Sequence, residues 1–302
     1  MTKAGKHIFV ITGATASGKS DFAFKLAKKN NGVIINADSM QIYKQIPIIS
    51  AQPKEKDKTS ISHYLYGFVD IFNKEKQYSV GDYILVLESI LTNIKSDKTP
   101  IIVGGTMLYI DAILHGLSYI PLIRDDVKFE VREKYKHALS DEIFSDLKLI
   151  DEKYAKIVDK SNTQRLIRGI EVKLSTGISI VDFWKQKQNS ILERYNVEKI
   201  IIDVPREELY KKINNRFDKM IENGVIDEAM SVYNYSINNN IDYTKLPKAI
   251  GLHEFFNFFN GTISLDEAIN KAKQFSRNYA KRQLTWFRNR CVDFRRMTVL
   301  NV

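Results

Sequence analysis

Residues 13–20 read Gly13-Ala14-Thr15-Ala16-Ser17-Gly18-Lys19-Ser20, which fits the phosphate-binding pattern G-x-x-x-x-G-K-[ST]. The apolar run His7–Ile11 before it is typical of a buried strand, and residues 21–27 after it have helical periodicity. A glycine-rich turn between a strand and a helix directs backbone N–H groups at one point, where the helix N-terminus adds partial positive charge. We therefore predict that the whole loop binds a phosphorylated ligand, with Lys19 at an outer phosphate and the Ser20 hydroxyl holding Mg²⁺.

The composition limits the class of protein. The chain has 302 residues, enough for one large domain or two, and its hydrophobic content of 44% suits a globular fold. Its formal net charge of +10 is compatible with a nucleic-acid partner, although the same charge spread thinly would serve only solubility. Cys291 is the only cysteine, which excludes an intrachain disulfide and a cysteine-based zinc module and fits the cytoplasm. The apolar run near the N-terminus is too short for a signal peptide or a membrane span, so we expect neither.

Two further apolar strands are predicted to end beside this loop. The first, Gly32–Ala37, ends at Asp38, and ligands of open parallel sheets bind at the carboxyl ends of the strands. Asp38 is therefore expected to face the phosphate loop, with a helix N-cap as its alternative role. The second, Pro100–Val103, is followed by Gly104-Gly105-Thr106 in place of the acidic residue that a hydrolytic P-loop protein usually carries there. The chain is thus poorly equipped to activate water for ATP hydrolysis.

The order of the predicted elements defines two domains. Residues 1–119 and 196–302 are predicted to form a P-loop NTPase-like α/β core, a parallel sheet with helices on both faces, because Glu198–Val204 returns to the sheet as a strand. Residues 120–195 are predicted to form a mainly helical inserted domain. Its expected helices cover residues 125–138, 141–149, 151–158 and 162–172.

The C-terminal part of the core is predicted to be helical. Pro205 takes the favoured first position of a helix with an apolar stripe, and Arg216 beside that stripe is able to point back towards the phosphates. The last helix opens with the capping box Ser264–Glu267 and runs to about Arg288. Basic side chains concentrate in this helix and alternate with aromatic ones, which indicates either a solvated face or a contact with a nucleic-acid backbone.

One helix of the inserted domain carries a pair of arginines. Leu166, Ile170 and Leu174 fall on one face of this helix, and Arg165 and Arg168 lie together off that face. Two arginines on one exposed turn are commonly solvated. The same pair is also suited to holding phosphates or stacking on bases.

Taken together, these segments resemble those of tRNA dimethylallyltransferases, the bacterial enzymes that prenylate adenosine 37 beside the anticodon. They come in the family order, cover nearly the whole chain and are highly specific as a set, whereas the first alone is shared by many nucleotide-binding proteins. The matching segments are Gly13–Ser20, Ile35–Tyr43, Val103–Tyr109, Asn162–Val172, Arg216–Met220, Lys248–Gly251 and Ala280–Arg288.

The resemblance implies that the loop of residues 13–20 binds the pyrophosphate of dimethylallyl diphosphate with Mg²⁺, and that adenosine 37 is flipped out of the anticodon loop to reach it. It implies that Asp38 accepts a hydrogen bond or proton from N6, while Thr106 and Arg216 hold the pyrophosphate oxygens. It also implies that tRNA contacts two segments and a third stretch, Lys248–His253. The residues of the first two segments are Asp38, Ser39, Met40, Gln41, Gln164, Arg165, Leu166, Ile167 and Arg168.

One stretch departs from the family pattern, and other functions stay open. The family has an arginine near the site just after the glycine-glycine-threonine helix, for which Arg124, Lys128 and Arg132 are three candidates here. A small-molecule P-loop kinase or an adenylate isopentenyltransferase would use the same loop, but neither needs a long surface for tRNA. An RNA-binding protein with a vestigial loop would not need Lys19, Ser20, Asp38 and Thr106 together, and their joint presence argues against it. We expect a cytoplasmic monomer.

Overall fold

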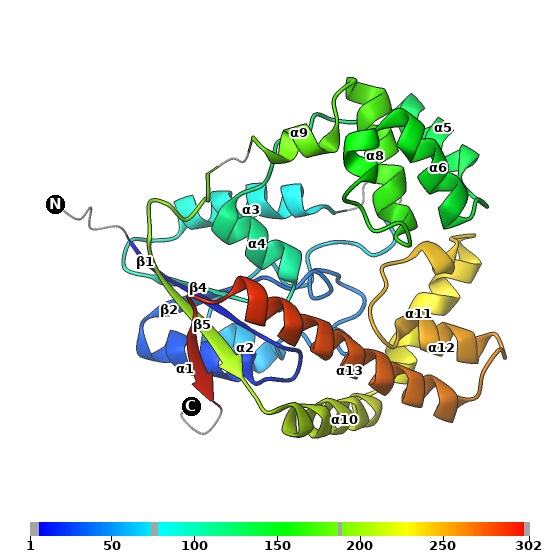
Figure 1. The fold of residues 1–302 in the computed structure, drawn as a ribbon. Helices are drawn as coiled ribbons and strands as arrows, with labels where there is room; N and C mark the ends of the chain where they lie inside the picture. The colour runs from blue at the N-terminus through cyan, green and yellow to red at the C-terminus, as the bar shows by residue number, and fades with distance from the viewer. Residues whose placement is uncertain (1–5, 74–77, 187–188, 299–302) are drawn as a thin grey trace. The chain divides into compact units, whose positions relative to one another are not determined.

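The computed structural model describes residues 6–73, 78–186 and 189–298 (Figure 1). The chain divides into two compact units: the core unit, Met1–Leu114 with Ile191–Val302, and the helical unit, His115–Ser190. The boundaries predicted from the sequence, at residues 119 and 195, lie a few residues further along the chain. Within the described ranges, no helix is both long enough and apolar enough to cross a membrane.

Parallel strands form a single sheet in the core unit. They are β1 (His7–Gly13), β2 (Gly32–Asn36), β3 (His63–Tyr64), β4 (Thr99–Val103), β5 (Asn196–Asp203) and β6 (Arg295–Thr298). Their order across the sheet is β3-β2-β4-β1-β5-β6. The central strand β1 pairs with β4 at Phe9 and Ile101 and with β5 at Phe9 and Glu198, so the segment after residue 196 does return to the sheet. The predicted parallel α/β fold is confirmed.

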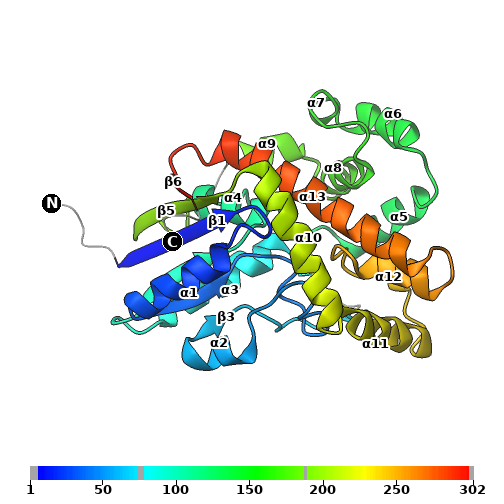
Figure 2. The ribbon, with the colours of Figure 1, turned by 90° about the horizontal axis from the view of Figure 1, so that it is seen from below.

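Helices cover both faces of this sheet. Those of the core unit are α1 (Lys19–Lys29), α2 (Glu55–Ser60), α3 (Val80–Asn93), α4 (Met107–His115), α10 (Arg206–Glu222), α11 (Val225–Asn238), α12 (Leu252–Phe259) and α13 (Leu265–Arg290), with the 3₁₀ turn η1 (Tyr243–Lys245). Ile8 and Val10 of β1 pack on the side of α3 and α4, whereas Phe9 and Ile11 pack on the side of α1 and α10. Figure 2 shows α1 and α10 on the second side. Burial on both faces explains why the strand is apolar at four consecutive positions, Ile8 to Ile11.

The C-terminal helices follow the sequence pattern with one correction. The apolar stripe of α10 is buried as expected, but Pro205 is the N-cap residue of this helix and Arg206 its first residue. In α13 the Ser264 side chain accepts a hydrogen bond from Glu267 N, and the Glu267 carboxylate accepts one from Ser264 N. This is the predicted capping box. Helices α10 to α13 pack around a second apolar cluster, which includes Phe217 and Phe255 and also Ile49 of the loop after β2.

The helical unit contains α5 (Asp125–Lys134), α6 (Ser140–Ile150), α7 (Glu152–Ala155), α8 (Thr163–Thr176) and α9 (Ile180–Trp184). The helix predicted for residues 125–138 thus ends at Lys134. Leu166 and Ile170 are buried as expected, but Leu174 is 51% exposed, so the apolar face of α8 is shorter than predicted. Since α8 ends at Thr176 and is capped by Gly177 in a left-handed conformation, Leu174 lies in its last turn.

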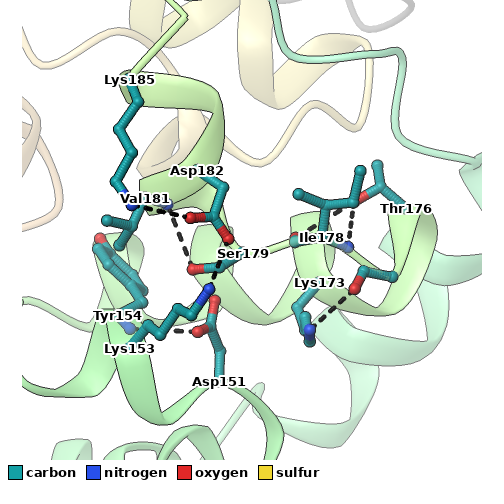
Figure 3. Close-up of polar contacts among 11 residues, drawn as sticks. Asp151, Lys153, Tyr154, Lys173, Thr176, Ile178, Ser179, Val181, Asp182 and Lys185 are labelled. Carbon is teal, nitrogen blue, oxygen red and sulfur yellow. Dashed lines mark hydrogen bonds and ion pairs between the residues drawn. The ribbon is translucent and has the colours of Figure 1, made fainter.

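Short helices of the helical unit begin at polar caps (Figure 3). Asp151 Oδ1 accepts a hydrogen bond from Tyr154 N at 3.1 Å at the start of α7, and Ser179 caps α9 through Val181 N. Lys153 of α7 donates to Asp182 of α9 at 3.0 Å. These contacts tie α7 to α9 and hold together helices that are too short to be stable alone.

Candidate active site

The phosphate loop joins β1 to α1. Gly18 adopts a left-handed conformation (φ 89°) and caps α1 without a side chain, so the first N–H groups of the helix face the loop. Ser17 N donates to Ala14 O at 3.1 Å and closes the turn. Lys19 Nζ donates to Ala14 O at 3.3 Å, which folds the ammonium group back over the loop. Backbone donors, a helix N-terminus and a lysine therefore converge where an anion binds in such loops.

Asp38 follows β2 and is fixed by a fully buried neighbour, Asn36. The Asn36 side chain accepts a hydrogen bond from Asp38 N at 2.8 Å and donates one to Asp38 O at 2.9 Å. Asp38 Oδ1 accepts a hydrogen bond from Met40 N at 3.0 Å. Because the next helix begins only at Glu55, the alternative role of Asp38 as a helix N-cap is wrong. The carboxylate is instead held by a local turn of the backbone.

Lys19, Arg216 and Asp38 are each half-buried and interact electrostatically with one another. Burial lowers the pKa of Lys19 to about 8, an effect that Asp38 opposes and Arg216 reinforces. Burial also lowers the pKa of Arg216, again against the effect of Asp38. Arg216 Nη2 donates to Thr15 Oγ1 at 2.6 Å, which links α10 to the phosphate loop. Two cations and one carboxylate leave an excess of positive charge in a low-dielectric region, which favours an anionic ligand.

The loop after β4 packs directly against the segment that carries Asp38. A Cβ atom on Gly104 would lie 2.1 Å from the backbone of Ala37, so only glycine permits this approach. Thr106 Oγ1 accepts a hydrogen bond from Ser39 N at 2.8 Å and donates to Ser39 Oγ at 3.2 Å. The Thr106 hydroxyl therefore fixes the residue next to Asp38.

Gln283 of α13 joins the two loops and was not singled out from the sequence. Its side chain is 1% exposed, accepts a hydrogen bond from Thr15 N at 2.8 Å and donates one to Gly105 O at 2.7 Å. Tyr279, one turn earlier, lies with its hydroxyl 3.5 Å from the same Gly105 oxygen, and burial and Asp38 together raise the pKa of this tyrosine. The sequence contains one sign of this role: Gln283 is a large polar side chain on the buried face of α13, where the other residues are small or apolar.

The residues present fit a magnesium ion that arrives with its ligand. Mg²⁺ is usually held by one or two protein oxygens together with substrate phosphates. The exposed Ser20 hydroxyl at the start of α1 is a suitable oxygen donor. In the part of the chain that the structure describes, no three His, Cys, Asp or Glu side chains cluster to hold a metal by themselves.

Four residues suggested as tRNA contacts lie in the loop after β2. Asp38 and Ser39 are held as described, and Met40 N is bonded to Asp38. The Gln41 side chain donates to Ser50 O at 3.0 Å and to Ala51 O at 2.8 Å. Gln41 therefore shapes its own loop, since both amide hydrogens bind backbone carbonyls.

The five remaining suggested tRNA contacts lie on α8 of the helical unit and differ in exposure. Gln164 and Arg165 are exposed. Leu166 is fully buried and Ile167 packs against the same apolar cluster, so the Leu166 side chain is a core residue and not an RNA contact. Arg168 Nη1 lies 3.6 Å from Glu171 Oε2 and is 43% exposed.

The three candidates for the family's additional arginine all lie at α5 and are paired within the helical unit. Arg124 pairs with Asp126 at 3.3 Å, and Lys128 with Asp125 at 2.8 Å. Arg132 Nε donates to Glu171 at 3.0 Å. The carboxylate of Glu171 is almost fully buried, so it holds Arg132 more firmly than an exposed acid would.

A groove with a volume of about 640 Å³ runs along α13 beside the start of α4. Its wall combines an indole, an ammonium group, a guanidinium group and short polar side chains, a set suited to stacking on bases and binding phosphates. The lining residues are Met107, Asn278, Lys281, Arg282, Thr285, Trp286 and Asn289. Of the aromatic residues noted in this helix, Phe287 is buried in the core and Phe275 is 44% exposed.

Comparison with known proteins agrees with this arrangement. The family model for IPP transferases matches residues 41–290. The tRNA dimethylallyltransferase of Orientia tsutsugamushi (strain Ikeda) is 38% identical over 95% of this chain and 92% of its own length. That of Ehrlichia chaffeensis is 42% identical over 94% of this chain and 91% of its own length.

Solved structures similar to this chain belong to the same family of enzymes. The tRNA isopentenylpyrophosphate transferase of Bacillus halodurans superposes with a TM-score of 0.67 at 32% identity, covering 97% of this chain and 90% of that one. A eukaryotic dimethylallyltransferase acting on tRNA superposes with a TM-score of 0.81 at 25% identity, covering 97% and 74%. A phosphate loop, an acid after β2 and a glycine-glycine-threonine loop thus occur here in a chain that matches these proteins over nearly its whole length, and it belongs to the IPP transferase family of tRNA dimethylallyltransferases.

Proposed function

We propose that this protein transfers the dimethylallyl group of dimethylallyl diphosphate to N6 of adenosine 37 in tRNA and releases pyrophosphate. The observation that supports this most directly is the half-buried group of Lys19, Arg216 and Asp38 at the phosphate loop. It combines excess positive charge for a diphosphate with one carboxylate able to accept a proton. The reduced, buried Cys291 is compatible with a cytoplasmic location.

The chemistry assigns a role to each side chain. The bond between C1 of the donor and its diphosphate oxygen breaks, and the electron pair leaves with pyrophosphate. Lys19, Arg216 and the loop N–H groups stabilise the charge that grows on this leaving group. C1 forms its new bond to N6 of adenosine, and Asp38 accepts the proton that N6 loses. Mg²⁺, when bound, supplies further positive charge at the diphosphate.

The proposed acceptor is a base in RNA and not a free nucleotide. The groove along α13 offers Trp286, Lys281 and Arg282 to a nucleic acid, and the net charge of the chain is +10. The solved eukaryotic relative acts on tRNA. Adenine N6 is hidden in a base stack, so the target nucleotide has to be flipped out to reach Asp38.

Two other reactions would use the same loop. A small-molecule kinase would need ATP as the donor, but the family match and the absence of an acid in Gly104-Gly105-Thr106 favour a prenyl diphosphate. An adenylate isopentenyltransferase would need only AMP as the acceptor. Such a small acceptor does not require the basic groove along α13.

The test is mass spectrometry of an anticodon stem-loop with A36 and A37 after incubation with dimethylallyl diphosphate and Mg²⁺. We expect one dimethylallyl group on A37, and no product from a stem-loop with G37. Parallel reactions replace the RNA with AMP or the donor with ATP. Prenylated AMP at a comparable rate would favour the free-nucleotide reaction, and an unmodified stem-loop in all reactions would contradict the proposal.

A further inference from the structure

Glu228, in the first turn of α11, binds the backbone of a distant loop. Its two carboxylate oxygens accept hydrogen bonds from Ile48 N at 2.7 Å and from Ile49 N at 2.8 Å. These donors lie at the start of a single helical turn, closed by bonds from Ser50 N to Ile46 O and from Ala51 N to Ile48 O. The first N–H groups of such a turn have no partner within it, and one carboxylate satisfies both.

This turn supports the segment that carries Asp38. Gln41, three residues after Asp38, donates both of its amide hydrogens to the end of the turn, at Ser50 O and Ala51 O. Gly67 N donates to Gln41 O at 2.9 Å, which ties the same segment to the chain just after β3. The position of the segment from Asp38 to Gln41 therefore depends on the turn that Glu228 holds.

The same turn also supports the stretch Lys248–His253. A Cβ atom on Gly251 would lie 3.1 Å from Ile49 Cδ1 and 3.2 Å from the Phe217 ring, so the backbone of this stretch rests on Ile49. Ile49, Phe217, Ala249 and Leu252 belong to one buried cluster. Two stretches that the family resemblance associates with tRNA thus meet at one turn.

We propose that Glu228 is a positioning residue for RNA recognition: by binding Ile48 N and Ile49 N, it fixes the turn on which both the Asp38–Gln41 segment and the Lys248–His253 stretch rest. The inference rests on the proposed function, because it assumes that these stretches meet an RNA acceptor. The hydrogen bonds of the Glu228 carboxylate go to Ile48 N and Ile49 N, so we expect its substitution to affect the RNA acceptor and not the donor.

The chemistry of the contact requires a carboxylate. Each of two backbone donors needs an acceptor, and glutamine offers one oxygen while its NH₂ group would face the second donor. Burial raises the pKa of Glu228, and the bonds from Ile48 and Ile49 oppose that rise. Burial disfavours the charged form of this acid. The two hydrogen bonds that its carboxylate accepts offset that cost.

The experiment compares Glu228→Gln with Asp227→Asn. Asp227 is the exposed acid next to it on α11, so the control removes the same charge from the same helix turn. We expect Glu228→Gln to raise KM for the anticodon stem-loop about tenfold, as the loss of a charge-assisted bond does, and to leave KM for dimethylallyl diphosphate within about twofold. Hydrogen exchange of the Ile48 and Ile49 amides should accelerate in Glu228→Gln and stay unchanged in Asp227→Asn.

A third variant distinguishes a displaced turn from a general loss of protein stability. Val232→Ala removes buried methyl groups from the same helix and keeps both hydrogen bonds of Glu228, so it should lower the unfolding temperature while leaving KM for the stem-loop unchanged. An unchanged KM for the stem-loop in Glu228→Gln, or an equal rise of KM for the donor, would overturn the inference. If the wild-type protein does not prenylate the stem-loop at all, the proposed function itself fails, and the two failures are thus distinguishable.

Discussion

Gln283 Nε2 donates a 2.7 Å hydrogen bond to the carbonyl oxygen of Gly105, and the two residues are 178 positions apart in the chain. The oxygen of the same amide accepts from Thr15 N at 2.8 Å. One buried side chain therefore sets the spacing between the phosphate loop and the glycine-glycine-threonine loop. Since neither loop is regular structure, their mutual position depends on such contacts.

We expect Gln283→Leu to weaken both the fold and the binding of the donor. Leucine has a similar size but leaves the Thr15 donor without its acceptor, at a cost of about 1–3 kcal/mol, and leaves Gly105 O with only the long 3.5 Å contact from the Tyr279 hydroxyl. Urea denaturation measures the loss of stability, and calorimetry with dimethylallyl diphosphate measures the loss of affinity. The control is Gln274→Leu, the same change on the exposed side of α13. Equal effects of the two substitutions would show that the link between the loops has no special role.

Asp38→Asn should separate donor binding from transfer. The amide keeps an oxygen for Met40 N but cannot accept a proton from N6, so the rate of transfer should fall by about 10²–10⁴-fold. Affinity for the diphosphate should stay the same or rise, because Asp38 partly neutralises Lys19 and Arg216. Single-turnover rates and donor affinity are measured on the same preparation. Asp21→Asn, which removes an exposed acid from the first turn of α1, should change the rate less than twofold. Full activity of Asp38→Asn would exclude this residue as the proton acceptor.

The sheet and its main helices could be predicted because they have strong local patterns. β1 is apolar from Ile8 to Ile11, and the capping box at Ser264 marks the start of α13. The elements that were missed lack such patterns. β6 (Arg295–Thr298) is a mostly exposed edge strand, and α2 (Glu55–Ser60) buries no residue. Neither has an apolar period from which a prediction could start.

The site was predictable where one contiguous motif holds it and not where distant segments meet. Residues 13–20 bring their donors together within one turn, so their geometry follows from the sequence. Thr15 and Gln283 are 268 positions apart, and Glu228 reaches Ile48 across 180 positions. Spacing carries no information over such distances, so these contacts required the structure.

Lys19 should make donor binding depend on pH. Its lowered pKa of about 8 means that the ammonium form is present below pH 8 and is lost above it. Affinity for dimethylallyl diphosphate should therefore be level below about pH 7 and fall by up to about tenfold per pH unit above pH 8. Calorimetry across this range measures the profile. Lys19→Met should bind about 10- to 100-fold more weakly at neutral pH and lose the dependence, whereas Lys25→Met, on the exposed side of α1, should behave as wild type.

Lys19 should also make the stability of the ligand-free protein depend on pH, and this stability should rise with pH where the affinity for the donor falls. Between pH 8 and the ordinary lysine value of 10.5, the unfolded state holds a proton on Lys19 that the folded state has lost. Stability rises with pH wherever the unfolded state binds more protons, so this residue should make the free energy of unfolding increase across that window. Urea denaturation of wild type and Lys19→Met at several pH values isolates the contribution as a difference. A constant difference would mean that Lys19 titrates normally and is not buried beside Arg216.

Arg165→Ala tests the helical unit as an RNA-binding element. Arg165 is exposed on α8, whereas Arg168 is paired with Glu171, so Arg165 is the freer of the two guanidinium groups to meet a phosphate. Loss of one phosphate contact should weaken binding of the stem-loop and lower the slope of log affinity against log salt by about 0.7–0.9. Titrations at several salt concentrations measure the slope. The control is Lys148→Ala, which removes an exposed cation from α6 and should leave both quantities nearly unchanged. Parallel binding curves for Arg165→Ala and wild type at every salt concentration would contradict a phosphate contact at this residue.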